Sequence, residues 1–265
     1  MDNIKIGVFD SGVGGMTVLK EIMKKLPEEN YIYLGDTKRF PYGSKSKESI
    51  IELTKSGIEF LINQGAKIVV IACGTATSQA LDEVKNLYNI PIIGVIEPTL
   101  KYIKKIEKNQ IGVMATYGTI RSKAWEKAIL KEIPNAKIQS IGCPLLAPMV
   151  EEGWTDNEIA HLVVQEYLKS FNKIDTLILG CTHYPLLTNV IRKQVGDKVE
   201  IINIGEYVAK EIENLLQNKN TKGNNNNLEI FLTETESKFN KLASKLLERE
   251  IQVKQVEEEV EFKVD

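Results

Sequence analysis

Two short segments place a cysteine where an apolar run ends, and their side chains could do acid–base chemistry. They are Cys73-Gly74-Thr75 and Cys181-Thr182-His183. A lone cysteine at such a position is usually a small core residue. Two cysteines in matching contexts favour a catalytic pair, because a thiolate accepts a proton as a general base and a thiol donates one as a general acid. Of the two histidines, His183 is a catalytic candidate, whereas His161 lies in a helical pattern and is interpreted as a surface residue.

The two cysteine segments belong to a longer internal similarity. Residues Ile68–Cys73 resemble Thr176–Cys181 at an offset of 108 residues, and Ile6–Ser11 resemble Ile111–Thr116 at an offset of 105 residues. Such short similarities could also be shared by any parallel strands. If the unit is duplicated, a pseudo-two-fold axis would put the two thiols on opposite walls of one cleft, at the carboxyl ends of strands where α/β sheets bind ligands.

Apolar, strand-like runs alternate with helix-like segments along most of the chain. The expected strands are Ile4–Asp10, Tyr31–Gly35, Lys67–Ala72, Ile92–Ile96, Gln110–Thr116, Lys137–Gly142, Thr176–Gly180 and Val199–Ile204. Segments such as Lys47–Asn63 and Glu158–Ser170 are long enough for crossover helices. This alternation predicts an α/β fold of two similar domains, each a parallel sheet flanked by helices, with the active site in the cleft between them.

The C-terminal part is expected to return to the first domain. A helical pattern at Tyr207–Gln217 runs into a polar stretch at residues 218–227, which is typical of a surface loop. Leu228–Leu232 and Ile251–Val256 then look like strands on either side of a helix at Ser237–Glu248. We therefore predict a first domain of residues 1–97 plus 208–265 and a second of residues 98–207.

Composition excludes several other classes of function. With 34 Lys and Arg against 36 Asp and Glu, the chain has no broad positive field for nucleic acid or a membrane surface. It has no spanning segment and no leader-like start, so a cytoplasmic location is expected. Three cysteines suggest free thiols rather than a disulfide framework, and Cys143 is interpreted as a packing residue. Without Cys-x-x-Cys or His-x-x-x-His spacing, we expect no metal site.

Two polar turns follow strands at the same predicted sheet edge. Asp10–Gly15 is a glycine-rich turn before a helix, whose free N–H groups suit a carboxylate, although a purely structural turn is an equal alternative. It is not a dinucleotide fingerprint, because Thr17 stands where the third glycine would be. Gly35–Lys45 is dense in glycine, proline and aromatic residues and could present backbone N–H groups to an anion. No cofactor is expected.

At these segments the sequence resembles the glutamate racemases of the aspartate/glutamate racemase superfamily. The matching stretches run in family order over about residues 4 to 207 and are Asp10–Gly15, Gly35–Gly43, Ala72–Thr75, Ala115–Thr119, Val150–Gly153 and Gly180–Pro185. The resemblance implies the two-domain fold, cofactor-independent interconversion of L- and D-glutamate, supply of D-glutamate for peptidoglycan, and a homodimer.

The resemblance also implies roles for individual residues. Cys73 and Cys181 match the two catalytic thiols, with Asp10, His183 and Glu151 as polar assistants. Cys181 would deprotonate L-glutamate and Cys73 would deprotonate D-glutamate. Substrate contacts would come from Asp10, Ser11, Tyr42, Gly43, Gly74, Thr75, Thr182 and His183, with Thr116 and Thr119 as weaker candidates.

One residue departs from the family pattern, and two other functions stay open. The family commonly has Asn where this chain has Gly74, so we expect a roomier pocket on the Cys73 side and tolerance of Asn at this position. An aspartate racemase would share the fold and both thiols but would need a shorter cleft. A non-catalytic, two-lobed amino-acid-binding protein is the other alternative, although it gives no reason for two matched thiols.

Overall fold

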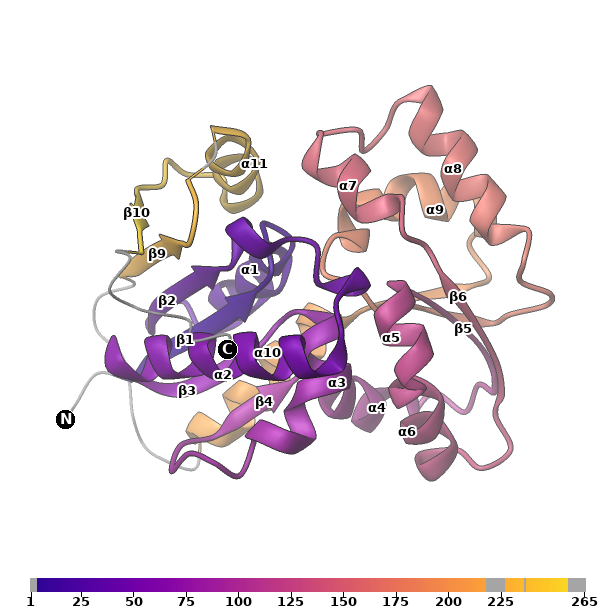
Figure 1. Cartoon of the computed structure of the whole chain (residues 1–265). Coiled ribbons are helices and arrows are strands. Elements are labelled where there is room, and N and C mark those ends of the chain that lie inside the picture. The colour runs from indigo at the N-terminus through magenta and orange to yellow at the C-terminus, as the bar shows by residue number, and fades with distance from the viewer. Residues whose placement is uncertain (1–3, 218–226, 236, 257–265) are drawn as a thin grey trace.

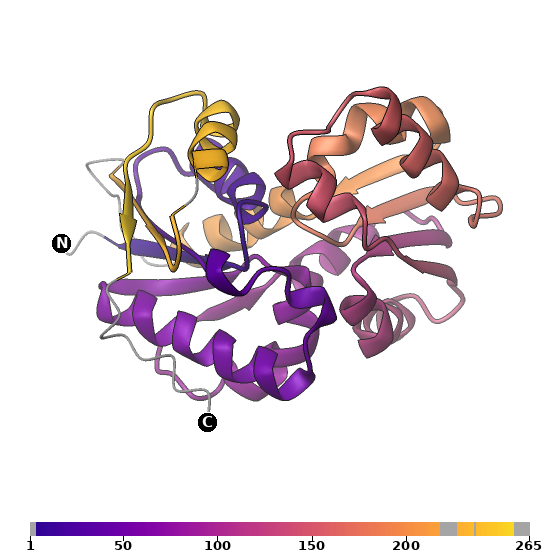
Figure 2. The same ribbon diagram turned by 45° about the horizontal axis from the view of Figure 1, so that its top comes forward.

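The computed structural model describes residues 4–217, 227–235 and 237–256. Its strands form two separate sheets, and every pairing in both is parallel. Helices flank each sheet, and the two resulting lobes lie side by side in two views of the molecule (Figure 1, Figure 2). The α/β class and the parallel sheets predicted from the alternation are confirmed.

The first sheet combines the N-terminal strands with the C-terminal return. Its order is β10-β9-β2-β1-β3-β4. These strands are β1 (Lys5–Asp10), β2 (Asn30–Gly35), β3 (Ala66–Ile71), β4 (Ile92–Gly94), β9 (Leu228–Leu232) and β10 (Val253–Gln255). Alternate residues face opposite layers, so Ile6 and Val8 pack in one apolar cluster while Phe9 packs in another. Burial on both faces explains the near-continuous apolar runs of the central strands.

The second sheet has the order β6-β5-β7-β8. Its strands are β5 (Gln110–Ala115), β6 (Lys137–Gly142), β7 (Thr176–Leu179) and β8 (Glu200–Asn203). This order is equivalent to β2-β1-β3-β4 of the first sheet, with β5 in the place of β1 and β7 in the place of β3. The internal similarity in the sequence therefore corresponds to equivalent strands in two equivalent sheets.

The helices connect the strands and also join the two lobes. They are α1 (Gly15–Lys25), α2 (Lys47–Asn63), α3 (Gly74–Val84), α4 (Ile96–Ile103), α5 (Tyr117–Ser122), α6 (Ala124–Glu132), α7 (Leu146–Glu151), α8 (Glu158–Leu168), α9 (Thr188–Val195), α10 (Ile204–Gln217) and α11 (Ser237–Leu247). Helix α10 packs against α1 and α4. One continuous apolar cluster contains Val8 of the first sheet, Val113 of the second and Ile212 of α10. A shared core of this kind fixes the lobes relative to each other.

Several element boundaries differ from the sequence expectations. Strand β4 ends at Gly94 rather than Ile96, because Ile96 begins α4. Helix α10 begins at Ile204, three residues earlier than expected, where the Asn203 side chain accepts a hydrogen bond from the Gly205 N–H at 3.2 Å. Asparagine in this role supports a helix start that apolar periodicity does not reveal. The predicted loop at residues 218–226 lies outside the described residues, and the predicted domain boundaries stay a prediction.

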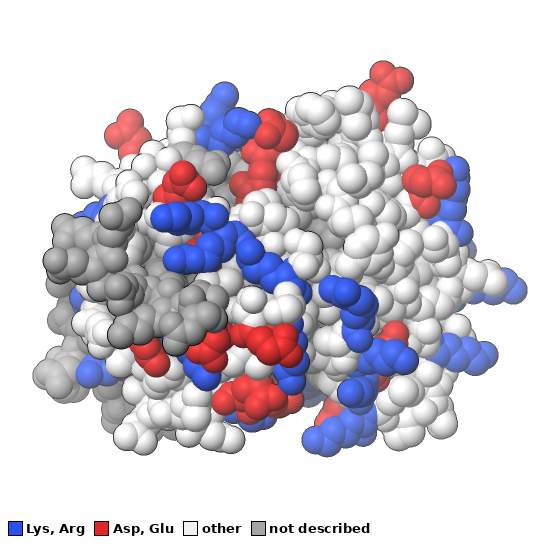
Figure 3. All heavy atoms as spheres, viewed as in Figure 1, with Lys and Arg blue, Asp and Glu red and all other residues white. Residues whose placement is uncertain are grey.

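The surface carries both signs of charge. On the face viewed in Figure 3, Lys and Arg side chains lie among Asp and Glu side chains, and the upper right of this face, over α7 and α8, is mostly uncharged. No helix among the described residues is both long and apolar enough to cross a membrane.

Candidate active site

Cys73 lies between β3 and α3, where its thiol touches polar groups of the first lobe. Its Sγ accepts a hydrogen bond from the Ala76 N–H at 3.5 Å and lies 3.6 Å from the Ser11 hydroxyl. Burial and, after it, the charge on Asp10 raise the pKa of the Cys73 thiol to about 12, although the hydrogen bonds with Ala76 and Ser11 lower it. Charge on Cys181 also raises the pKa of Cys73. In this arrangement Cys73 is the protonated partner, suited to donate.

Cys181 follows β7 and has a histidine beside it. Nδ1 of His183 lies 3.8 Å from Sγ of Cys181, and Nε2 of the same ring lies 2.6 Å from Oε1 of Glu151 on α7. Burial lowers the pKa of His183, but its hydrogen bonds to Cys181 and Glu151 and the Glu151 charge together raise the pKa well above its usual value. A protonated imidazole therefore faces the Cys181 sulfur, where it can stabilise negative charge.

Asp10 ends β1 and contacts the segment of Cys181. Its carboxylate accepts hydrogen bonds from the Gly12 N–H at 3.0 Å and from the Thr182 hydroxyl at 3.2 Å. Burial raises the pKa of Asp10 to about 6, although the charge of His183 and the hydrogen bonds lower it. This buried carboxylate from one lobe therefore contacts the residue that follows Cys181 in the other.

Three threonines from both lobes form a cluster of hydroxyl groups. The Thr75 and Thr116 hydroxyls lie 2.8 Å apart, Thr116 and Thr119 lie 3.0 Å apart, and the Thr119 hydroxyl donates to Thr75 at 3.4 Å. Thr75 is in the first turn of α3 and Thr116 caps α5, so two helix N-termini converge here. Hydroxyls and free N–H groups at helix N-termini suit a carboxylate. Thr116 and Thr119 are thus as well placed as Thr75.

The Tyr42 side chain is buried in the first lobe, in the same apolar cluster as Cys73. Its hydroxyl donates to Oδ2 of Asp36 at 2.6 Å, and Thr233, which follows β9, donates to Oδ1 of the same carboxylate at 2.9 Å. Because the phenol is occupied, Tyr42 and Gly43 would meet a substrate through their backbone groups. Asp36 was missed at the sequence level, although it directly follows β2 at the same sheet edge where Asp10 ends β1.

The glycine-rich turn after β1 has a packing role. A Cβ at Gly14 would lie 2.4 Å from Nδ1 of His183 and from Oγ1 of Thr182, so only glycine allows this approach. The Thr17 hydroxyl donates to the Thr182 carbonyl across the same boundary at 2.8 Å. Thr17 was considered only as a break in a glycine motif, yet it joins the two lobes. The turn docks the Cys181 loop against α1.

Gly74 overturns one expectation. A Cβ at this position would lie 2.2 Å from the carbonyl oxygen of Gly180 in the second lobe. The expected roomier pocket on the Cys73 side is therefore wrong, because the backbone of the other lobe occupies that space. The expected tolerance of Asn at this position is unsupported for the same reason.

The remaining candidates of the sequence lie away from the thiol pair or in the core. Cys143 is fully buried in an apolar cluster, in agreement with a packing role. His161 lies in α8, and its Nε2 is 3.0 Å from Oδ1 of the exposed Asp156. Among residues 4–217, 227–235 and 237–256, no group of three or more His, Cys, Asp or Glu side chains could hold a metal ion.

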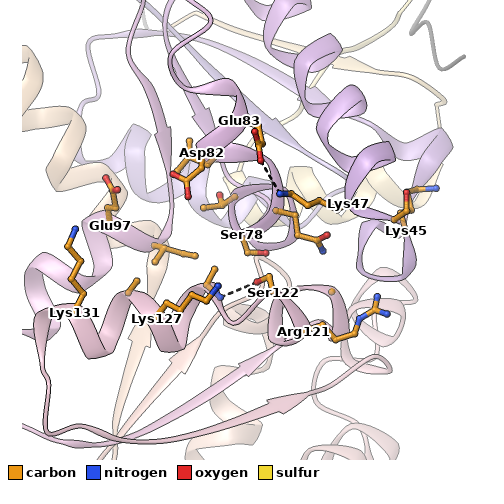
Figure 4. Close-up of a pocket in the computed structure, with 18 residues that line it drawn as sticks. Lys45, Lys47, Ser78, Asp82, Glu83, Glu97, Arg121, Ser122, Lys127 and Lys131 are labelled. Atoms are coloured by element: carbon orange, nitrogen blue, oxygen red, sulfur yellow. Dashed lines mark hydrogen bonds and ion pairs between the residues drawn. The ribbon is translucent and has the colours of Figure 1, made fainter.

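Two cavities flank this region, and they differ in chemistry. One of about 480 Å³ is lined by Gly43 and Thr116 together with apolar residues such as Pro144 and Ala147. The other, of about 730 Å³, lies between α3 and the α5–α6 segment and is lined by charged side chains, with Lys47 paired to Glu83 at 3.0 Å (Figure 4). Neither Cys73 nor Cys181 lines either cavity. The smaller cavity includes Gly43 and Thr116 of the predicted substrate contacts, so we place the candidate site at the thiols and this neighbouring cavity.

Comparison with known proteins assigns the chain to a family. The model of the Asp/Glu/Hydantoin racemase family matches residues 7–212, which include both thiols and all of the assisting residues. The chain belongs to this family. A glutamate racemase of Geobacter metallireducens is 45% identical over 215 residues, covering 80% of each chain.

Solved structures of Asp/Glu/Hydantoin racemase relatives agree with the fold. A crystal structure of glutamate racemase isoform RacE1 from Bacillus anthracis has a TM-score of 0.91 and 39% identity, covering 97% of this chain and 98% of that one. Glutamate racemase from Francisella tularensis, solved in complex with D-glutamate, has a TM-score of 0.89 and 38% identity over the same shares. The two-sheet architecture predicted here is therefore that of glutamate racemases.

Proposed function

We propose that this chain interconverts L-glutamate and D-glutamate, with Cys73 and Cys181 as the two acid–base groups. The observation that carries the proposal is the pair of buried thiols at the ends of equivalent strands, β3 and β7, of two equivalent sheets. Opposite faces of one α-carbon can be served only by groups on opposite walls. The names of the relatives support glutamate as the substrate.

The resemblance to glutamate racemases supplies the direction of the first step, in which Cys181 acts on L-glutamate. Cys181, whose Sγ lies 3.8 Å from Nδ1 of His183, takes the α-proton of L-glutamate when it acts as a thiolate, and it then becomes a thiol. Cys73, whose pKa is raised to about 12, delivers its own proton to the opposite face and becomes a thiolate. One C–H bond breaks and one forms, and the reverse reaction starts from D-glutamate with the roles exchanged.

Negative charge that develops beside the substrate carboxylate needs preorganised donors. The hydroxyls of Thr75, Thr116 and Thr119 and the N-termini of α3 and α5 are donors of this kind. Backbone groups at Tyr42 and Gly43 and the polar side chains of Ser11 and Thr182 complete the proposed substrate contacts. Because two thiols supply both acid and base, the proposal includes no cofactor and no metal.

The deciding experiment follows circular dichroism of purified protein with L-glutamate and, separately, with L-aspartate. We expect the circular dichroism signal of L-glutamate to decay and that of L-aspartate to stay constant. Faster loss with aspartate would favour an aspartate racemase, and tight binding with no change of either signal would favour a non-catalytic binding protein. Activity that vanished on exhaustive dialysis and returned only with a cofactor or metal would contradict the cofactor-free mechanism.

The biological setting is part of the same proposal. D-glutamate made by this reaction would supply peptidoglycan synthesis in the cytoplasm, where free thiols stay reduced. By resemblance to the family, the active form would be a homodimer. Depletion of the protein should be rescued by external D-glutamate, and the mass of the purified protein in solution should be twice 29.8 kDa. A monomeric mass with full activity would refute the dimer.

A further inference from the structure

Thr17 of α1 donates a hydrogen bond to the turn that carries Cys181. Its hydroxyl lies 2.8 Å from the carbonyl oxygen of Thr182 in the second lobe. Only 7% of Thr17 and 2% of Thr182 are exposed, so water competes little for this bond. The Thr182 carbonyl belongs to the peptide group that links Thr182 to His183. The bond therefore fixes the orientation of the main chain directly between Cys181 and the His183 ring.

The Thr17 hydroxyl has a second acceptor, but that acceptor does not depend on it. The Gly14 carbonyl lies 2.9 Å from the hydroxyl and also accepts the Thr17 N–H at 2.9 Å. Loss of the hydroxyl would leave Gly14 with a donor, whereas the Thr182 carbonyl would lose the donor at 2.8 Å. The consequence of such a loss therefore falls on the second lobe.

Helix α1 is a firm support for this bond. A Cβ at Gly205 of α10 would lie 3.1 Å from Cα of Val18 and 3.4 Å from the carbonyl oxygen of Thr17, so the two helix backbones are in close contact. Met16, Val18 and Leu19 of α1 are fully buried in the apolar cluster that both lobes share. Because α1 is packed in this way, the turn of the second lobe is the part that can move if the bond is lost.

We infer that Thr17 is a positioning residue that holds the turn Cys181-Thr182-His183 against α1 and so fixes the Cys181 sulfur relative to the substrate. The inference rests on the proposed function and extends it to a residue that touches no reacting atom. An error of about 1 Å in the placing of a reacting group can cost about 100-fold in rate. Cys73, which lies between β3 and α3, should be affected less.

The first test separates proton removal by Cys181 from proton removal by Cys73. Racemisation cannot separate them, because enantiomers have equal free energies and kcat/KM must be the same in both directions. Elimination of HCl from threo-3-chloroglutamate needs a single thiolate, which takes the α-proton while the C–H electron pair forms a double bond and chloride leaves. In the proposed function the L-isomer reacts through Cys181 and the D-isomer through Cys73.

In Thr17→Val, elimination from the L-isomer should fall about 10-fold to 100-fold, and at least about fivefold more than elimination from the D-isomer. Thr17→Ser keeps the hydroxyl and should restore the wild-type ratio of the two rates. Thr54→Val is the matched control, because the buried Thr54 hydroxyl donates to the Ile50 carbonyl within α2 at 2.6 Å. Equal losses with both isomers in Thr17→Val, or the same altered ratio in Thr17→Ser, would overturn the inference.

The second test does not depend on catalysis. A turn released from α1 should raise the rate at which iodoacetamide alkylates Cys181, which is 6% exposed, with the fully buried Cys143 as internal reference. Thr17→Ala is measured beside Thr17→Val, because alanine favours the helix and keeps α1 folded if valine does not. Equal alkylation of Cys181 in the wild type, Thr17→Ala and Thr54→Val would refute the positioning role. If the wild type failed to racemise glutamate but Thr17→Ala still exposed Cys181, the proposed function alone would be wrong.

Discussion

Nε2 of His183 lies 2.6 Å from Oε1 of Glu151, while Nδ1 of the same ring lies 3.8 Å from Sγ of Cys181. The carboxylate holds the ring in one orientation and favours its protonated form. Because the ring is 2% exposed, water contributes little to stabilising that charge. Glu151 thus acts on Cys181 through His183.

Replacing Glu151 by Gln should therefore slow proton removal by Cys181 more than proton removal by Cys73. The amide keeps the shape but removes the negative charge, so elimination of HCl from the L-isomer of threo-3-chloroglutamate should fall about 10-fold to 100-fold. Elimination from the D-isomer, which uses Cys73, should change less. Glu152→Gln is the control, because Glu152 is exposed and pairs with Lys238 at the surface. Equal losses of elimination rate with both isomers would contradict a role of Glu151 that is specific to Cys181.

Removing either thiol should abolish racemisation, but the remaining thiol should still remove the α-proton from one enantiomer. In Cys73→Ser and Cys181→Ser, racemisation should fall by at least about 100-fold, because a serine hydroxyl replaces the partner thiol poorly. Cys73→Ser should still eliminate HCl from the L-isomer of threo-3-chloroglutamate, and Cys181→Ser from the D-isomer. Cys143→Ala serves as the thiol control and should remain active. Full racemisation in either serine variant, or the same isomer preference in both, would rule out the two-thiol mechanism.

Burial of Asp10 should make stability depend on pH in a defined sense. Its pKa rises from 3.8 to about 6, so between these values the folded protein binds more protons than the unfolded chain. The free energy of unfolding therefore falls as pH rises from about 4 to about 7, by about 3 kcal/mol from this group. Relative to the wild type, Asp10→Asn should gain that amount over the same range, as measured by urea unfolding.

An exposed aspartate provides the control for this measurement. The pKa of Asp156 is lowered by its hydrogen bond to His161 and by Lys193, so it contributes stability that is present at neutral pH and lost on acidification. Asp156→Asn should therefore become relatively less stable as pH rises, which is the opposite sign. If the difference in unfolding free energy between the wild type and Asp10→Asn did not vary with pH, the pKa of Asp10 would not be raised in the folded protein.

Thr233 should influence substrate binding from the C-terminal return. Its hydroxyl donates to Asp36 at 2.9 Å, and Asp36 in turn holds the Tyr42 hydroxyl at 2.6 Å. In Thr233→Val the buried Asp36 loses one of two donors to Oδ1 and keeps Arg39 at 2.5 Å, while the Lys38 N–H loses its acceptor, at a cost of about 1 to 2 kcal/mol. We expect the KM for glutamate to rise about fivefold to tenfold with a smaller change in kcat, because in the proposed function this loop contacts the substrate and not the reacting proton.

Thr235→Val, two residues further on, is the matched control, because the Thr235 side chain is exposed and its bond to Gln255 is long, at 3.5 Å. The measurement is the KM and kcat for glutamate of the two variants by steady-state kinetics. A drop in kcat at unchanged KM in Thr233→Val would place the effect on the chemical step and contradict the loop-positioning role.

The sequence by itself determined the α/β class, the equivalent strands and the thiol pair. These follow from local patterns, since buried parallel strands read as apolar runs and strand ends carry the polar residues. The similarity between Ile68–Cys73 and Thr176–Cys181 was enough to indicate that two cysteines occupy equivalent positions.

Only the tertiary structure decided which groups touch across the two lobes. Gly74 looked like a source of space when residues were read one at a time, but the Gly180 carbonyl, far away in the sequence, fills that space. Asp36 looked like one polar residue among several in a loop until β9 brought Thr233 to it. Contacts of this kind depend on how two sheets and a returning strand pack together, and residue types along the chain do not contain those distances.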